Sequence, residues 1–264
     1  MNNIISEDKN LIIGSSDTKY VQSANSLFHF MKKIEYLKTE LEQKCMVPRY
    51  FDEDASFYNI QGLSTMAYPM ICFCDIKLHT IFPHSEVYGN YAIAFSKDFC
   101  INKSIQPITY LNDKSTYFEK IRGAIITAVN CDNDDVVYEM LSDQLVYSMS
   151  YTKPLIGIQK GQKKNFHDEQ EWRYIPDLSL TEMPYFIMNS VDKGDLKENY
   201  NETLKYIDKG KLEFDYSDVQ YLFVENKNDK TILIDFINSL DIDESDKYNL
   251  ISNILVLDTI RGDL

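Results

Sequence analysis

The order in which two apolar patterns follow each other constrains the fold of this 264-residue chain more than any other feature. Short apolar runs, typical of strands, occur at residues 25–31, 66–76 and 91–95. A helical pattern, with apolar residues three or four positions apart, covers residues 34–45 directly after the first run. Strand and helix patterns do not alternate strictly, as they would in a doubly wound sheet. The patterns therefore predict an α+β fold, with a mixed or antiparallel sheet and flanking helices, in a single domain over residues 1–264.

Proline and serine set two of the predicted boundaries. Because Pro69 cannot donate a hydrogen bond to a neighbouring strand, the second strand is expected to begin after it. Ser96 is expected to cap a new helical turn after the third strand. Residues 46–65 are polar and aromatic without a period, so they are predicted to form a loop.

The middle of the chain is predicted to hold helices at residues 114–129 and 134–150. Strands are then expected on either side of the connection at residues 161–170. The acidic stretch at residues 189–202 is expected to be an insertion or a hinge.

The C-terminal segment, residues 214–264, has its own strand and helix patterns. It is predicted to contain a strand at residues 220–225, a helix at 230–240, a second helix capped by Ser245, and a final strand at 253–260.

Composition argues against several classes of protein. The chain has 41 acidic and 27 basic residues, a net charge of −14, so direct binding to nucleic-acid phosphates is not expected. It has neither an apolar window of about 18 residues nor a secretory signal, so we expect no membrane association and a cytoplasmic location. Five cysteines at irregular spacing fit a reducing compartment, and no metal site is expected. Gly-rich phosphate-binding motifs are absent from the sequence.

The segment "NFHDEQEWRYIP", residues 165–176, contains the first candidate site. In an extended strand Glu169, Glu171 and Arg173 would point to one face, with Trp172 on the other. One interpretation is a half-buried strand with a salt-bridged polar face and Trp172 in the core. The other is a carboxylate pair at the edge of a pocket, where it could grip a sugar hydroxyl and stabilise an oxocarbenium-like transition state.

A histidine near the N-terminus is the second candidate. His29 lies among aromatic residues in "LFHF". It is either a core residue with its hydrogen bonds satisfied or a residue that contacts a ligand.

Four segments resemble the AbiGi family of abortive-infection, phage-resistance proteins: "LFHFMKKIEYLKTELEQ", "AYPMICFCDIKLHTIFPHSEVYGNYAIAFSKDF", "IQPITYL" and "KPLIG…NFHDEQEWRYIP". The similarity covers roughly residues 26–177. The resemblance implies the antitoxin half of a two-gene defence system, whose partner would be a nucleotidyltransferase-like toxin or another defence protein.

A second resemblance is to ADP-ribosyltransferases, including PARP-like and DarT-type enzymes. Their early strand bears a histidine, a later strand bears an aromatic residue near a serine, and a late strand bears a catalytic glutamate, often as Glu-x-Glu. His29, Tyr91, Ser96 and the pair Glu169 and Glu171 resemble these elements in the same order.

This second resemblance implies NAD as cofactor and a site in one cleft. Glu171 would be catalytic with Glu169 as its companion. His29 would contact the adenosine-side ribose and Tyr91 would stack on nicotinamide, with Ser96 and Arg173 as further cofactor-binding candidates.

Three functional hypotheses follow from the sequence. The first is an antitoxin-type component of a phage-defence system. The second is an NAD-consuming ADP-ribosyltransferase that modifies a protein or nucleic acid. The third is a non-catalytic scaffold or interaction domain.

Overall fold

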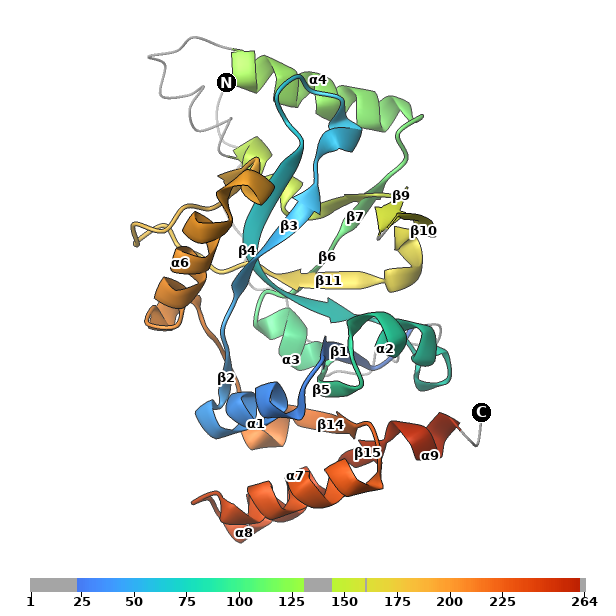
Figure 1. The fold of residues 1–264 in the computed structure, drawn as a ribbon, viewed down its shortest axis with the longest axis vertical. Helices are drawn as coiled ribbons and strands as arrows, with labels where there is room; N and C mark the ends of the chain where they lie inside the picture. The colour runs from blue at the N-terminus through green and yellow to red at the C-terminus, as the bar shows by residue number, and fades with distance from the viewer. Residues whose placement is uncertain (1–22, 131–143, 160, 262–264) are drawn as a thin grey trace, which may run out of the picture.

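The strands form one large sheet and three two-stranded sheets in the computed structural model, which describes residues 23–130, 144–159 and 161–261 (Figure 1). The large sheet holds nine strands: β1 (Ser26–Met31), β3 (Arg49–Asp54), β4 (Thr65–Cys74), β5 (Tyr91–Ser96), β6 (Gln106–Pro107), β11 (Glu171–Tyr174), β12 (Ile187–Met188), β14 (Val219–Val224) and β15 (Ile254–Val256). The small sheets pair β2 (Cys45–Met46) with β13 (Leu212–Glu213), β7 (Thr109–Leu111) with β8 (Thr152–Pro154), and β9 (Ile156–Gln159) with β10 (Gln162–Asn165).

Helices flank the large sheet on both faces. They are α1 (Ile34–Gln43), α2 (Phe82–Tyr88), α3 (Lys97–Asn102), α4 (Thr116–Asn130), α6 (Gly194–Leu204), α7 (Lys227–Ser239), α8 (Glu244–Ser252) and α9 (Leu257–Arg261), with short 3-10 turns that include η3 (Phe166–Glu169). Helices beside a sheet in which only β14 and β15 run parallel confirm the predicted α+β class. Within the described residues, no helix combines the length and apolar character needed to cross a lipid bilayer.

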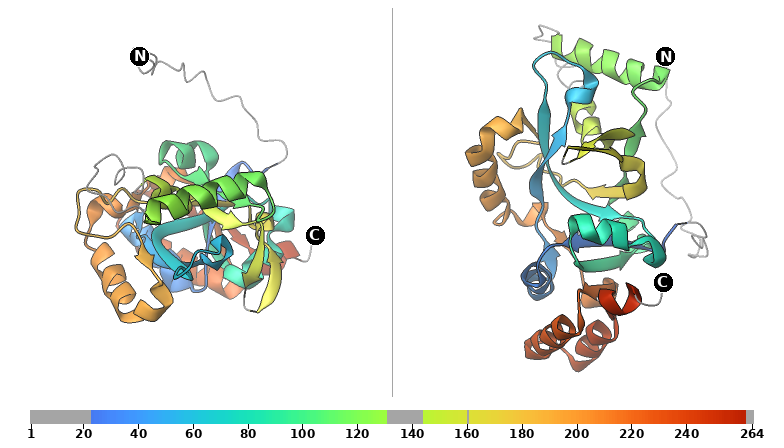
Figure 2. Two further views of the ribbon diagram at one scale, coloured as in Figure 1. Left: turned by 90° about the horizontal axis from the view of Figure 1, so that it is seen from above. Right: turned by 45° about the vertical axis from the view of Figure 1, so that its right-hand side comes forward.

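Two faces of the sheet bury different clusters. On one face Leu37 of α1, Leu233 of α7 and Leu250 of α8 pack in the same apolar core as Ile93 and Phe95 of β5. The opposite face carries a cluster around α4 at one end of β4 and a cluster around Phe28 and Phe223 at the other. Figure 2 shows α4 and the pair α7 and α8 at opposite ends of the molecule.

Pro69 lies inside β4, so the expectation that this strand begins after it is wrong. Pro69 is opposite Tyr50 of β3, and Tyr50 donates its backbone N–H to the Asn201 side chain at 2.8 Å instead of to β4. On β4, the pairing with β12 ends at Ala67 and the pairing with β11 starts at Ile71. The missing N–H of proline therefore falls where no neighbouring strand needs a donor.

One further expectation is wrong, and another stays a prediction. Residues 46–65, predicted to be a loop, contain β3, which pairs with β4 over six residues from Arg49 to Asp54. Residues 189–202, predicted to be an insertion or hinge, form most of α6 and the turn before it. Its Asn201 is buried and binds Tyr50, so this segment is fixed to the sheet.

The strand predicted at residues 91–95 is confirmed, and it extends one residue further, to Ser96. The Ser96 hydroxyl accepts the N–H of Phe99 at 3.2 Å and caps α3 as predicted. Gly89, just before β5, has a φ of 124° and leaves no room for a side chain, because a Cβ there would lie 2.1 Å from the Met31 carbonyl oxygen.

The C-terminal segment completes the large sheet. β14 pairs antiparallel with β5, and β15 pairs parallel with β14. The N-cap residue of the second helix is Asp243 and not Ser245, and its side chain makes no capping hydrogen bond. The final strand ends at Val256, and α9 begins at the next residue, Leu257. The helix expected at residues 134–150 lies partly outside the described residues, which show helix at 144–149.

Candidate functional site

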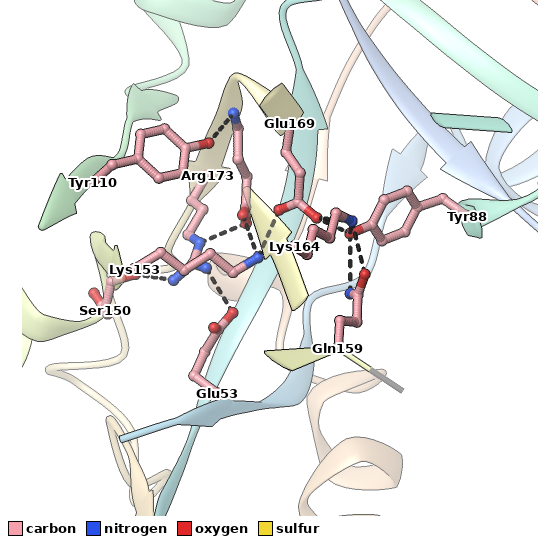
Figure 3. Close-up of polar contacts among 10 residues, drawn as sticks. Glu53, Tyr88, Tyr110, Ser150, Lys153, Gln159, Lys164, Glu169 and Arg173 are labelled. Atoms are coloured by element: carbon pink, nitrogen blue, oxygen red, sulfur yellow. Dashed lines mark hydrogen bonds and ion pairs between the residues drawn. The ribbon is translucent and has the colours of Figure 1, made fainter. Parts of the chain in front are cut away.

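A buried network of three carboxylates and three cations occupies one face of the sheet beside β11 (Figure 3). The acids are Glu53, Glu169 and Glu171, and the cations are Lys153, Lys164 and Arg173. They come from β3, η3, β11, β8 and β10, so the network joins the small sheets to the large one.

Arg173 is the centre of the network and is fully buried. Its Nε donates to Glu171 Oε1 at 2.7 Å, and its Nη2 donates to Glu53 Oε1 at 2.6 Å. Its Nη1 donates to the Ser150 carbonyl oxygen. A buried guanidinium is stable only when its donors are satisfied in this way.

Lys153 links the two carboxylates of the Glu-x-Glu pair. Its Nζ lies 2.9 Å from Glu169 Oε2 and 2.8 Å from Glu171 Oε2. The other oxygen of Glu169 accepts from Lys164 at 2.6 Å and from the Tyr88 hydroxyl in a short hydrogen bond. Each oxygen of Glu169 and Glu171 therefore has a protein donor.

The local backbone explains how the two glutamates converge. Glu169 ends the turn η3, and Gln170 adopts a left-handed conformation with a φ of 43° before β11 begins at Glu171. Glu169, Glu171 and Arg173 do face one site, as the sequence predicts. Glu169 reaches it from a turn, however, and not from an extended strand.

The electrostatics of the network follow from burial and from these contacts. Burial alone would raise the pKa of Glu171, but the charges of Arg173 and Lys153 outweigh it and lower the pKa to about 2. The pKa of Glu169 is lowered in the same way, because Lys153 and Lys164 outweigh its burial. At Glu53 burial outweighs the charges of Arg173 and Lys153, so its pKa is raised. Glu171 is therefore held as a carboxylate.

His29 and Tyr91 lie on the other face of the sheet from Glu171. Glu171 and Phe28 are both opposite Cys74 of β4, so they share a face, and His29 is the next residue in β1. Tyr91 pairs with Met31 and shares the face of His29. To line one cleft, the side chains of these three residues would have to point to the same face of the sheet. The expectation that they do is wrong, because Glu171 points to one face and His29 and Tyr91 point to the other.

The contacts of His29, Tyr91 and Ser96 are also different from those of a cofactor site. His29 Nδ1 lies 2.8 Å from the Cys72 carbonyl oxygen and its Nε2 lies 3.7 Å from Glu40 Oε1. The Tyr91 hydroxyl donates to Asp229 at 2.9 Å, and Ser96 caps α3. Residues arranged in this way do not fit one bound NAD molecule.

Trp172 lies on the face opposite Glu171, as expected, and packs partly buried against the core under α1 and α7. Of the network, the sequence interpretation missed Glu53, Lys153, Lys164 and Tyr88. One signal was available: residues 153–165 contain four lysines and no acid, directly before the two glutamates. Among the described residues, no group of three or more His, Cys, Asp or Glu side chains could hold a metal ion.

Comparison with known proteins places this chain among phage-resistance proteins. A family model described as "abortive phage resistance protein AbiGi, antitoxin" matches residues 44–225, a range that contains every residue of the network. The abortive phage resistance protein AbiGi of Lactococcus lactis subsp. cremoris is 36% identical over 246 residues, which is 82% of this chain and 98% of that protein. No solved structure matches the chain.

Proposed function

Because this chain belongs to the AbiGi family of abortive phage resistance proteins, we propose that it acts in phage defence as an antitoxin-type component that restrains a toxin protein by direct contact. The observation that carries the proposal is the antitoxin family model, which spans residues 44–225. The partner would be a nucleotidyltransferase-like toxin, as the family resemblance implies.

The geometry of the network fits a structural role better than a catalytic one, which favours an antitoxin-type component over an ADP-ribosyltransferase. A general base or a sugar-binding carboxylate needs an oxygen that can accept a hydrogen bond from the substrate. Both oxygens of Glu171 are already bound, one by Arg173 and one by Lys153, and the residue is only 6% exposed. A substrate hydroxyl would have to displace a buried cation, which is costly.

A growth assay tests this function. The gene next to the one that encodes this chain is expressed alone and together with it, and growth is followed after induction. We expect growth arrest with the neighbouring gene alone and recovery when this chain is present, also with Glu171→Gln if that variant folds. Arrest caused by this chain alone and relieved by Glu171→Gln would contradict the proposal and favour an enzyme.

A further inference from the structure

The β9–β10 hairpin presents apolar side chains to solvent and polar ones to the protein. Ile156 and Ile158 alternate along β9 and are 51% and 69% exposed. On the inner face, Gln159 and Lys164 contact each other and the Tyr88 hydroxyl. A sheet with one solvated face normally shows the reverse pattern, with apolar residues inward. The reversed pattern indicates that the outer face is an interaction surface, which another molecule covers on binding.

The hairpin is held against the rest of the protein by specific contacts. The exposure of Ile156 and Ile158 is therefore a feature of a fixed conformation. Lys164 is anchored to Glu169 at 2.6 Å. Gly157, opposite Lys164, lies flat on Phe166, where a Cβ would come within 2.5 Å of the ring. A two-stranded hairpin alone is marginally stable, and these contacts hold it in place. Such a preformed surface loses little conformational entropy on binding.

The chemistry of the outer face indicates what it would bind. Lys163 is directly opposite Ile158 and exposed on the same face. Asn165 is opposite Ile156, and its amide donates to Asp168 at 2.9 Å. An apolar centre edged by polar groups is the usual composition of a protein interface. We call Ile156, Ile158 and Lys163 the outer hairpin face.

Charge narrows the kind of partner further. Lys153 and Lys164 are neutralised by Glu169 and Glu171, so Lys163 supplies the positive charge on the outer side of the hairpin, in a chain whose net charge is −14. A carboxylate on the partner would be attracted locally to Lys163, which would favour one orientation of approach.

We propose that the outer hairpin face docks the toxin-type partner, on an apolar patch of that protein edged by carboxylates; this inference rests on the proposed function. In Figure 1 the hairpin lies at the right-hand edge of the molecule, above β11. Two exposed isoleucines favour a protein surface over a phosphate backbone, which would need further cations in their place.

The test compares matched variants of the full chain for binding to the purified product of the neighbouring gene by calorimetry. Ile158→Ser and Lys163→Glu are placed on the outer hairpin face. Ile101→Ser and Lys120→Glu are the controls, because they make the same changes at exposed positions of α3 and α4. We expect each hairpin variant to weaken binding by about tenfold or more, and each control by less than about twofold. Raising the salt concentration should reduce the loss of affinity caused by Lys163→Glu, because salt screens charges. The loss of affinity caused by Ile158→Ser should not change.

Four outcomes would overturn the inference, and they are distinguishable. Absence of any complex with the unmodified chain refutes the proposed function and the docking site together. A complex that Ile158→Ser leaves intact refutes the docking site alone. Binding of a labelled 20-nucleotide RNA that is lost in Lys163→Glu and kept in Ile158→Ser would assign the face to nucleic acid. A dimer of the purified chain that Ile158→Ser dissociates in sedimentation would assign it to a second copy.

Discussion

His29 and Glu171 lie on opposite faces of one sheet, in the two strands that flank β4. Cys74 of β4 is opposite both Phe28 and Glu171, which fixes this relationship through the register alone. A ligand bound against one of these side chains is separated from the other by the sheet. The relationship is a property of the backbone, so rotation of side chains cannot change it.

The first prediction concerns NAD. Because no single ligand can touch both His29 and Glu171, we expect no nicotinamide release from NAD above the rate in buffer. The measurement is chromatographic detection of nicotinamide with the purified chain and with Glu171→Gln. Turnover by the unmodified chain that falls by 30-fold or more in Glu171→Gln, the loss expected for about 2 kcal/mol of transition-state stabilisation, would show that the network is catalytic.

The second prediction concerns the centre of the network. Arg173→Met leaves Glu171 and Glu53 buried without their main cation, so it should lower the free energy of unfolding by about 3–5 kcal/mol. Urea denaturation measures this change. Lys205→Met is the control, since its ion pair with Glu202 is exposed and should contribute less than about 1 kcal/mol. Equal losses in the two variants would show that the network does not stabilise the fold.

The third prediction concerns acid. The pKa of Glu171 is about 2 in the folded chain against an ordinary value of 4.5, so the unfolded chain binds more protons between these values. The stabilisation by Glu171 is complete above pH 4.5 and is lost as the pH falls towards 2. Glu171→Gln should be less stable than the unmodified chain at pH 7 and should lose less stability on acidification. Urea midpoints at pH 7 and pH 3 measure this, with exposed Glu42→Gln as control; parallel losses in all three proteins would contradict it.

The fourth prediction concerns Glu40, whose Oε2 is buried without a hydrogen-bond partner. Burial raises its pKa to about 8 from an ordinary 4.5, so the folded chain retains a proton that the unfolded chain releases. The contribution of Glu40 to the free energy of unfolding should therefore fall as the pH rises from 4.5 to 8. Glu40→Gln should be more stable than the unmodified chain at pH 8, with a smaller difference at pH 5. Thermal melts test this; the same gain in Glu35→Gln, an exposed position of α1, would refute it.

The fifth prediction concerns Trp172, which is partly buried against the core under α1 and α7. Because part of the ring remains exposed, Trp172→Ala should cost about 2–3 kcal/mol, less than the 3–5 kcal/mol of a fully buried tryptophan. Tyr248→Ala, at a residue that is 67% exposed, should change stability by less than about 0.5 kcal/mol. Equal melting temperatures for Trp172→Ala and the unmodified chain would mean that the faces of β11 are wrongly assigned.

The sequence correctly predicted those helices and strands that depend on patterns within a few neighbouring residues. The strand at Tyr91–Ser96, its Ser96 cap and the helix after β1 all follow from patterns within a few residues. β3 pairs with the next strand, β4, but it could not be found in this way, because the cations that pair with its acidic residues Asp52 and Glu53 lie far along the chain. Glu53 is an example, since its partner Arg173 is 120 residues away.

The sequence likewise predicted only part of the candidate site, namely the residues that are close together in the chain. Glu169, Glu171 and Arg173 were expected together because they are close in sequence, and they are together. Joining His29 and Tyr91 to them required the register of β1, β4 and β11, which a single sequence does not reveal. Spacing can suggest which residues belong to a family pattern, but the face of each strand depends on pairings across the whole sheet.

The ion pair between Glu53 and Arg173 has a consequence for synthesis on the ribosome. These residues are 120 positions apart, so at 5–20 residues per second about 6–24 s separate their emergence. During that interval β3 and β4 have been made, but the cations that neutralise their face have not. The strands β8, β10 and β11 must then come together, because Lys153 shares Glu169 with Lys164 and shares Glu171 with Arg173. We therefore expect this face to close cooperatively, once β11 has left the exit tunnel.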